Sequence, residues 1–289
     1  MFLTDKYRSS SHGHGHDRHS KKLHNYSPEA FEEALIFRLK SLPPLPPSSP
    51  SIPLSWLASA VRLLSATLSS FASLLSDPSL SLSVADLSPH LDSSSASLLD
   101  AANSISAAVD RLTSLRLHLR LSLRRGSVPL WDPEPASASL AFPLSVPPAP
   151  RGRTATSVRR AVFAVEAVSS LVVGSVLAGL GHAAAAASLT RIRVPAELPW
   201  AHAFNAVASA VQGRTGAAEI AAVTAAVEKL KAAASGNDGV EEAVVATEEM
   251  AEGLEALGNA VDGLFRAGLR ARNAAMQSFR AGLGPNKCK

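Results

Sequence analysis

The apolar run from Ala161 to Ala187 constrains this chain more than any other feature of its sequence. Only Glu166 and His182 interrupt a stretch of otherwise apolar or small residues. A helix of this length can cross a lipid bilayer, but a helix surrounded by other helices in a soluble bundle has much the same composition. The run therefore predicts either a central core helix or a membrane span, and its sequence leaves both open.

The composition of the chain favours helices over sheets. Hydrophobic residues make up 46% of the 289 residues, while aromatic residues make up only 5%. Alanine, leucine and serine dominate and runs of β-branched residues are scarce, so we predict an all-α fold, an elongated bundle around a central hydrophobic helix. The formal net charge of +4 comes from a small and dispersed excess of lysine and arginine, which does not indicate a nucleic-acid partner.

Shifts in composition divide the chain into a tail, a helical domain and two connections. Residues 1–26 are polar and contain five of the nine histidines, so they are expected to form a disordered tail. Residues 27–289 are expected to form a single helical-bundle domain. The Pro-rich stretches 42–53 and 126–153 would interrupt it as an extended linker and as a poorly ordered connection.

Local signals predict where several helices begin and end. Ser27 is a suitable N-cap, Pro28 suits the first helical position, and this helix should end by Leu42. Apolar residues with helical spacing predict further helices over 54–76, 91–125, 200–213, 217–234 and 240–281. The last of these has apolar residues alternately four and three apart, a coiled-coil-like pattern typical of a long helix that packs lengthwise against a partner, either in the same chain or in another.

Candidate metal-binding and catalytic residues are few. His12, His14 and His16 alternate with glycine and are weak candidates for binding a divalent metal, although a solvated low-complexity tail explains them better. Glu166 is the nearest approach to a general acid, but a structural role is favoured in which Arg159, Arg160 or an interhelical hydrogen bond satisfies its carboxylate. His202 has no triad partners, so a role in packing or at a helix start is favoured. Common catalytic and nucleotide-binding motifs do not occur, and we predict neither enzymatic activity nor a cofactor.

One face of the apolar run carries small residues. Ser170, Gly174 and Ala178 are four residues apart, which would allow another helix to approach closely. Together with Glu166 they are the predicted helix-packing face if the run is a core helix, and the predicted membrane face if it is a span. Basic residues flank both ends of the run, so their distribution gives only a slight preference for a cytoplasmic N-terminal side.

Five segments in order resemble the plant BYPASS family. They are FEEALIFRLKSL (31–42), LSWLASAVRLLSATLSSFASLLSD (54–77), LDSSSASLLDAANSISAAVDRL (91–112), AVFAVEAVSSLVVGSVLAGL (161–180) and VPAELPWAHAFNAV (194–207). The cluster Trp200, His202 and Phe204 after a Val-Pro pair is the most distinctive part. The resemblance implies a plant protein linked to the control of root-to-shoot signalling and to root and shoot development, and it supplies no catalytic residues.

Two hypotheses for function follow. The first is a non-enzymatic regulatory or scaffold protein of the BYPASS type, which acts through protein partners. The second is a membrane-associated adaptor in trafficking or secretion, anchored by residues 161–187. They place the chain in the cytoplasm or on the endoplasmic reticulum or another endomembrane, and neither requires a nucleic acid or a small-molecule substrate.

Overall fold

The fold is all-α, as the composition predicts. The computed structural model describes residues 27–47, 49–77, 87–127, 131–133, 142, 144–150, 156–232 and 238–282. In this part of the chain the helices are α2 (Pro28–Lys40), α3 (Leu54–Leu75), α5 (Ser88–Arg125), α6 (Ser157–Gly179), α7 (Ala183–Leu189), α8 (Ala201–Val211), α9 (Ala218–Ala232) and α10 (Asp238–Gly282). The His-rich tail and its candidate metal ligands His12, His14 and His16 lie outside the described residues.

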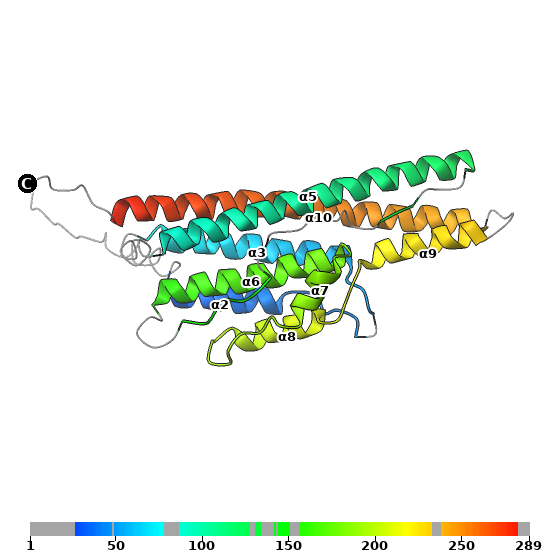
Figure 1. Ribbon diagram of the computed structural model, residues 1–289. Coiled ribbons are helices and arrows are strands. Elements are labelled where there is room, and N and C mark those ends of the chain that lie inside the picture. Colours follow the sequence, from blue (N-terminus) through cyan, green and yellow to red (C-terminus); the bar gives the residue numbers. More distant parts are fainter. Residues whose placement is uncertain are drawn as a thin grey trace, which may run out of the picture.

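The long axis of the molecule is set by α5 and α10, which lie side by side (Figure 1). They run antiparallel, because ion pairs join Asp92 to Arg272 near one end and Arg120 to Glu248 near the other. Helix α3 packs along the central part of α10. The predicted lengthwise packing of the 240–281 helix is therefore within the chain, and the resulting bundle is elongated.

Helix α6 is the central hydrophobic helix of the bundle. Of its most apolar 18-residue window, 94% is buried by the rest of the protein. It packs against α3, where the backbone of Gly179 lies directly beside the side chain of Leu57. Helices α2 and α8 cover another side of α6 (Figure 1).

The predicted run from Ala161 to Ala187 is not one continuous helix. Helix α6 ends at Gly179, and α7 begins at Ala183. Gly181 has a φ of 96°, and the amide of His182 donates to the carbonyl of Leu177. This is the hydrogen-bond pattern of a Schellman motif, which ends a helix at a residue in the left-handed conformation. The glycine at this position is what breaks the run.

Two helices in the described part of the chain are long and apolar enough to cross a membrane. One is α6, and the other is α3, of whose most apolar window 56% is buried. Length and composition alone make them candidates, and a mostly buried core helix meets the same criteria.

The described residues of the Pro-rich segment 42–53 form no helix, and they pack closely on the bundle. The indole of Trp56 donates to the carbonyl of Pro43 at 2.9 Å. Ile52 is fully buried and forms a short parallel bridge with Ala217. In the second Pro-rich stretch, Trp131 is buried and its indole donates to Thr224 of α9.

Beyond the bundle, α9 and the adjoining parts of α5 and α10 form an arm. Helix α9 lies along the N-terminal part of α10, on the side where α10 extends past α3 (Figure 1). We define the arm as residues 113–125 of α5, α9 and residues 238–252 of α10. Exposed aliphatic side chains gather on it, at Leu117, Leu121, Val244 and Val245.

Candidate functional site

An apolar cavity of about 270 Å³ lies between α5 and α6. Its inner wall comes from α3 and α10, and the segment around Phe142 to Pro147 borders it on the outside. Leu68, Phe71, Leu98, Phe142, Val162 and Val165 supply most of its apolar surface. Since α5 and α6 both begin near this end of the bundle, the cavity lies between their N-terminal halves.

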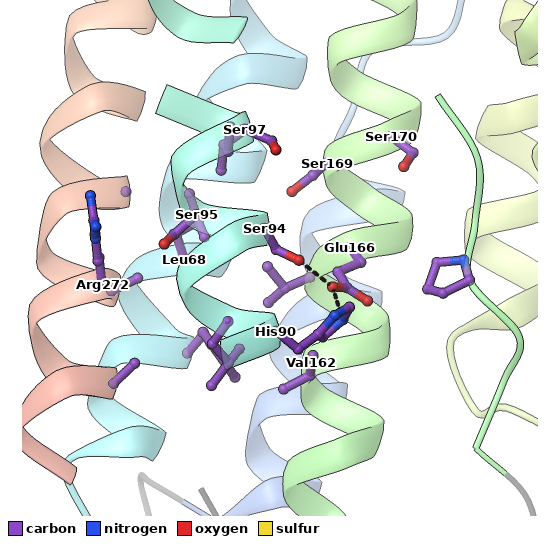
Figure 2. A pocket seen from close by; sticks show the side chains of 18 of the residues that line it. Leu68, His90, Ser94, Ser95, Ser97, Val162, Glu166, Ser169, Ser170 and Arg272 are labelled. Carbon is purple, nitrogen blue, oxygen red and sulfur yellow. Dashed lines mark hydrogen bonds and ion pairs between the residues drawn. The ribbon is translucent and has the colours of Figure 1, made fainter. Parts of the chain in front are cut away.

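Glu166 is the charged group at the centre of this site (Figure 2). Its side chain is only 15% exposed, and its Oε1 atom lies 2.6 Å from Nε2 of His90. The hydroxyl of Ser94 donates to the same oxygen at 2.7 Å. Both partners come from α5, so the carboxylate of α6 connects the two helices that form the walls of the cavity.

Of the alternative partners proposed for Glu166, the structure therefore has the interhelical hydrogen bond and not Arg160. Arg160 instead pairs with Glu32 of α2, at 2.7 Å. Helix periodicity explains this choice: Arg160 and Glu166 are six residues apart and point to different sides of α6.

Two hydroxyl groups face each other one turn further along the walls. Ser97 lies three residues after Ser94 on α5, and Ser169 lies three residues after Glu166 on α6 (Figure 2). Ser169 is buried, with 5% of its surface exposed. Within the described part of the chain, neither hydroxyl makes a hydrogen bond, whereas Ser175 in the same helix donates to the carbonyl of Leu171. Ser169 thus keeps an unused hydroxyl at the cavity wall.

One further charged pair borders the cavity. Arg272 of α10 lines the cavity and is bound by Asp92 of α5, with 2.8 Å between the guanidinium and the carboxylate. The pair joins α5 to α10. The positive charge of Arg272 is thus already matched by a neighbouring carboxylate.

The predicted small face of α6 has two different environments. Ser170 lines the cavity and donates to the carbonyl of Ser145 at 3.2 Å. Gly174 lies further along, where a Cβ atom would come within 2.9 Å of the side chain of Leu189 in α7. The carbonyl of Ala178 accepts from the amide of Gly216. This face thus packs within the chain and contributes only Ser170 to the cavity.

The distinctive cluster after the Val-Pro pair lies away from the cavity. Trp200 and Phe204 are fully buried, and the ring of Trp200 contacts Phe163 of α6 with 5.9 Å between centroids. His202 is exposed on α8, unlike Trp200 and Phe204. The cluster fastens α8 to the central helix.

The sequence alone singled out Glu166 and Ser170 but missed the side of the cavity that α5 provides. His90, Ser94 and Ser97 are four and three residues apart, which places them on one face of a helix. These residues form a polar stripe on a helix that also has a buried apolar stripe. The sequence could have indicated the α5 side of the site by this stripe. That it faces Glu166 follows from tertiary packing.

The cavity is large enough for a small ligand. Among the described residues, no group of three His, Cys, Asp or Glu side chains is placed to hold a metal ion. Comparisons with protein-family models, with curated proteins and with solved structures find no match for this chain.

Proposed function

We propose that this chain is a non-enzymatic regulatory or scaffold protein of the BYPASS type, which acts through protein contacts in root and shoot developmental signalling. The resemblance of five ordered segments to that family supports the proposal. Residues of all five segments are buried in the helical core, including Phe31, Trp56, Leu98, Phe163 and Phe204. The segments that resemble the BYPASS family thus include residues of the helical core.

The observation that best supports a contact function is the exposed aliphatic surface of the arm. Leu117 and Leu121 are one turn apart on α5 and are 48% and 47% exposed. Val245 of α10, at 53%, lies near the Arg120–Glu248 ion pair that joins the two helices there. Exposed aliphatic residues that gather on one part of a surface often mark protein contact sites.

The environment of Glu166 supports a role without catalysis. Its carboxylate already has two partners, and both hold α5 and α6 together. If the chain were instead an enzyme that uses Glu166 as an acid or base, purified protein would turn over a metabolite and Glu166→Gln would abolish turnover. That outcome would overturn the proposal.

A genetic test addresses the contact surface directly. In a plant line that lacks this chain, we expect a root and shoot defect that the wild-type sequence restores. The double substitution Leu117→Glu and Leu121→Glu should fail to restore it although the protein folds and accumulates. Asn103→Glu with Ser104→Glu adds the same charge to exposed positions of the same helix and should restore growth. Equal restoration by both variants would remove the arm from the proposal.

The second candidate is a membrane-associated adaptor for trafficking or secretion. It rests on the two helices that are long and apolar enough to span a bilayer, α3 and α6. Exposure of α6 to lipid would require the helices that now cover it to move away. Alkaline carbonate extraction of the tagged chain separates the two candidates: release into the soluble fraction supports the scaffold, and retention in the membrane pellet supports the adaptor.

A further inference from the structure

We propose that the cavity between α5 and α6 binds a small, neutral, apolar molecule with one hydrogen-bonding oxygen, and that the hydroxyl of Ser169 holds this oxygen. The site goes beyond the scaffold function and does not depend on it. The argument rests on the size and lining of the cavity, on the hydroxyl of Ser169 and on the pairing of the charged side chains nearby.

The size and lining of the cavity define the body of the ligand. An apolar cavity of about 150 Å³ accommodates a benzene molecule. The volume here, about 270 Å³, therefore has room for a ring with a short side chain, about ten non-hydrogen atoms in all. The ring would lie among Phe71, Leu98, Val162 and Val165. Water is held poorly beside such side chains, so an apolar ligand that displaces it gains affinity.

The hydroxyl of Ser169 defines the position of the polar end of the ligand. Ser169 lines the cavity and is only 5% exposed, and its hydroxyl points towards α5 across the cavity (Figure 2). It makes no hydrogen bond with any described residue. A buried hydroxyl without a partner is costly, and a ligand oxygen would supply the missing hydrogen bond.

The free state of this hydroxyl is not a general property of helical serines in this chain. Ser65 and Ser175, for example, donate to the carbonyl four residues earlier in their helices. Ser169 does not make the equivalent bond to the carbonyl of Val165, so its hydroxyl remains available on the cavity side. Ser97, on the opposite wall, is only partly buried, so its hydroxyl can be satisfied by water.

The charged side chains beside the cavity are already paired, which favours a ligand without charge. Oε1 of Glu166 lies 2.6 Å from Nε2 of His90, and the other carboxylate oxygen points away from Ser169 (Figure 2). Arg272 is bound to Asp92. An ionic group beside Ser169 would therefore lose its hydration without gaining a free opposite charge, and burial of an unpaired charge is costly. A hydroxyl or carbonyl group needs only the one hydrogen bond.

The test compares four ligands of similar shape on the full-length protein by isothermal titration calorimetry. The probes are 2-phenylethanol, ethylbenzene, 2-phenylethylamine and phenylacetate. We expect the alcohol to bind with a dissociation constant between about 10 µM and 1 mM, in keeping with a ligand of this size. The charged amine and the charged acid should each bind at least about tenfold more weakly than the alcohol, because each would have to bury an unpaired charge.

Substitution of Ser169 tests the hydrogen bond. Ser169→Ala should weaken binding of the alcohol about fivefold and leave the affinity for ethylbenzene unchanged, because only the alcohol has an oxygen to bond. The matched control is Ser175→Ala, which removes a buried hydroxyl from the same helix at a position that does not line the cavity. It should change neither affinity.

A second substitution locates the binding. Ala271 lines the cavity, so Ala271→Leu would fill part of the space and should abolish binding of both the alcohol and ethylbenzene. Ala206→Leu makes the same change at an exposed position of α8 and should have no effect. Circular dichroism checks that each variant is folded.

Several results would overturn the site. One is the absence of saturable binding of the alcohol to the wild-type protein at millimolar concentration. Another is binding of the amine or the acid as tight as that of the alcohol, a comparison that needs no variant and so stands even if Ser169→Ala does not fold. Equal loss of alcohol and ethylbenzene affinity in folded Ser169→Ala, or binding that persists in folded Ala271→Leu, would do the same. None of these results bears on the arm or on the scaffold function.

Discussion

At the scale of single residues, Arg214 shows how a buried charge can organise a Pro-rich segment. It is 8% exposed, and its guanidinium donates to the carbonyls of Ala210, Ser49, Ser51 and Pro46. Three of these carbonyls belong to the segment between α2 and α3, which lacks helical hydrogen bonds of its own. The arginine thus supplies hydrogen-bond donors to the carbonyls of a segment whose prolines have no N–H group.

Replacement of this arginine should therefore destabilise the protein. We expect Arg214→Met to lower the free energy of unfolding by about 3 kcal/mol, because four hydrogen bonds from a buried, charged guanidinium are lost. Arg193→Met removes an exposed guanidinium that bonds to Asn205, Ser209 and Gln212, and it should cost less than about 1 kcal/mol. Urea unfolding measures both, and equal losses would contradict this account of Arg214.

A second residue-scale prediction concerns His182, which follows the turn after α6. Desolvation lowers the pKa of His182, and the positive charge of Arg111 adds to the effect. The folded state therefore binds a proton less readily than the unfolded state. Stability is greatest above the unfolded pKa of about 6.5 and falls as the pH drops from there towards the lower folded pKa. His182→Gln should remove this part of the pH dependence, and a wild-type protein with the same pH profile as the variant between about pH 7 and 5 would refute it.

Residue-level prediction from sequence succeeded where the chemistry is local. Ser27 caps α2 by accepting from the amide of Ala30, as its position before Pro28 indicates. The partners of Glu166 could not be predicted in this way. His90 and Ser94 are more than 70 positions away in the chain, and only the packing of α5 beside α6 brings them together.

At the scale of elements, the helix boundaries depend on how many local signals coincide. Helix α5 ends at Arg125 as predicted, because two arginines precede Gly126, whose φ is 63°. The end of α6 within the run from Ala161 to Ala187 was harder to predict, since the composition is the same on both sides of the break. The left-handed Gly181 was a signal within the run, but alanines on its far side continue the apolar pattern.

Two glycines of α10 should respond in opposite ways to the same substitution. A Cβ atom at Gly253 would come within 2.7 Å of the Cβ atom of Leu54, the first residue of α3, and a Cβ atom cannot rotate out of the way. At Gly258 it would lie 3.7 Å from Val109, an ordinary contact. We expect Gly253→Ala to destabilise the protein by about 1 to 3 kcal/mol through overpacking. Gly258→Ala should stabilise it by about 0.5 to 1 kcal/mol, because alanine favours the helix.

Thermal and urea unfolding of the two variants provide the measurement. Each variant is the control for the other, since both add one methyl group to the same helix. Stabilisation by Gly253→Ala would mean that α3 and α10 are not in the close contact described. If Gly258→Ala destabilised the protein as much as Gly253→Ala, α5 would have to lie closer to α10 beside Gly258 than the 3.7 Å contact with Val109 indicates.

At the scale of the whole molecule, the arm and the bundle differ in the size of their buried side chains. The bundle core contains Trp56, Phe71, Phe163 and Trp200. In the arm, α9 and α10 bury mainly alanine and valine, together with Met250, and α5 buries Leu119. Because hydrophobic stabilisation grows with the apolar area removed from water, the arm gains less per residue than the bundle. The amphipathic pattern predicted the helices of the arm but not their projection past α3, which depends on where α3 begins.

This difference predicts a gradient of backbone protection along α10. Native-state hydrogen exchange reports the free energy needed to open each region, and regions with few buried apolar contacts open first. Amides of residues 254–271, which pack against both α3 and α5, should therefore exchange most slowly. Amides of residues 241–250 should exchange faster, even though they belong to the same continuous helix. Mass spectrometry of peptides from α10 measures the two rates in one experiment.

Substitution of Met250 by alanine should increase exchange in 241–250 and leave 260–271 almost unchanged, because the arm would open without the bundle. Uniform protection along α10 would instead show that arm and bundle unfold as one unit.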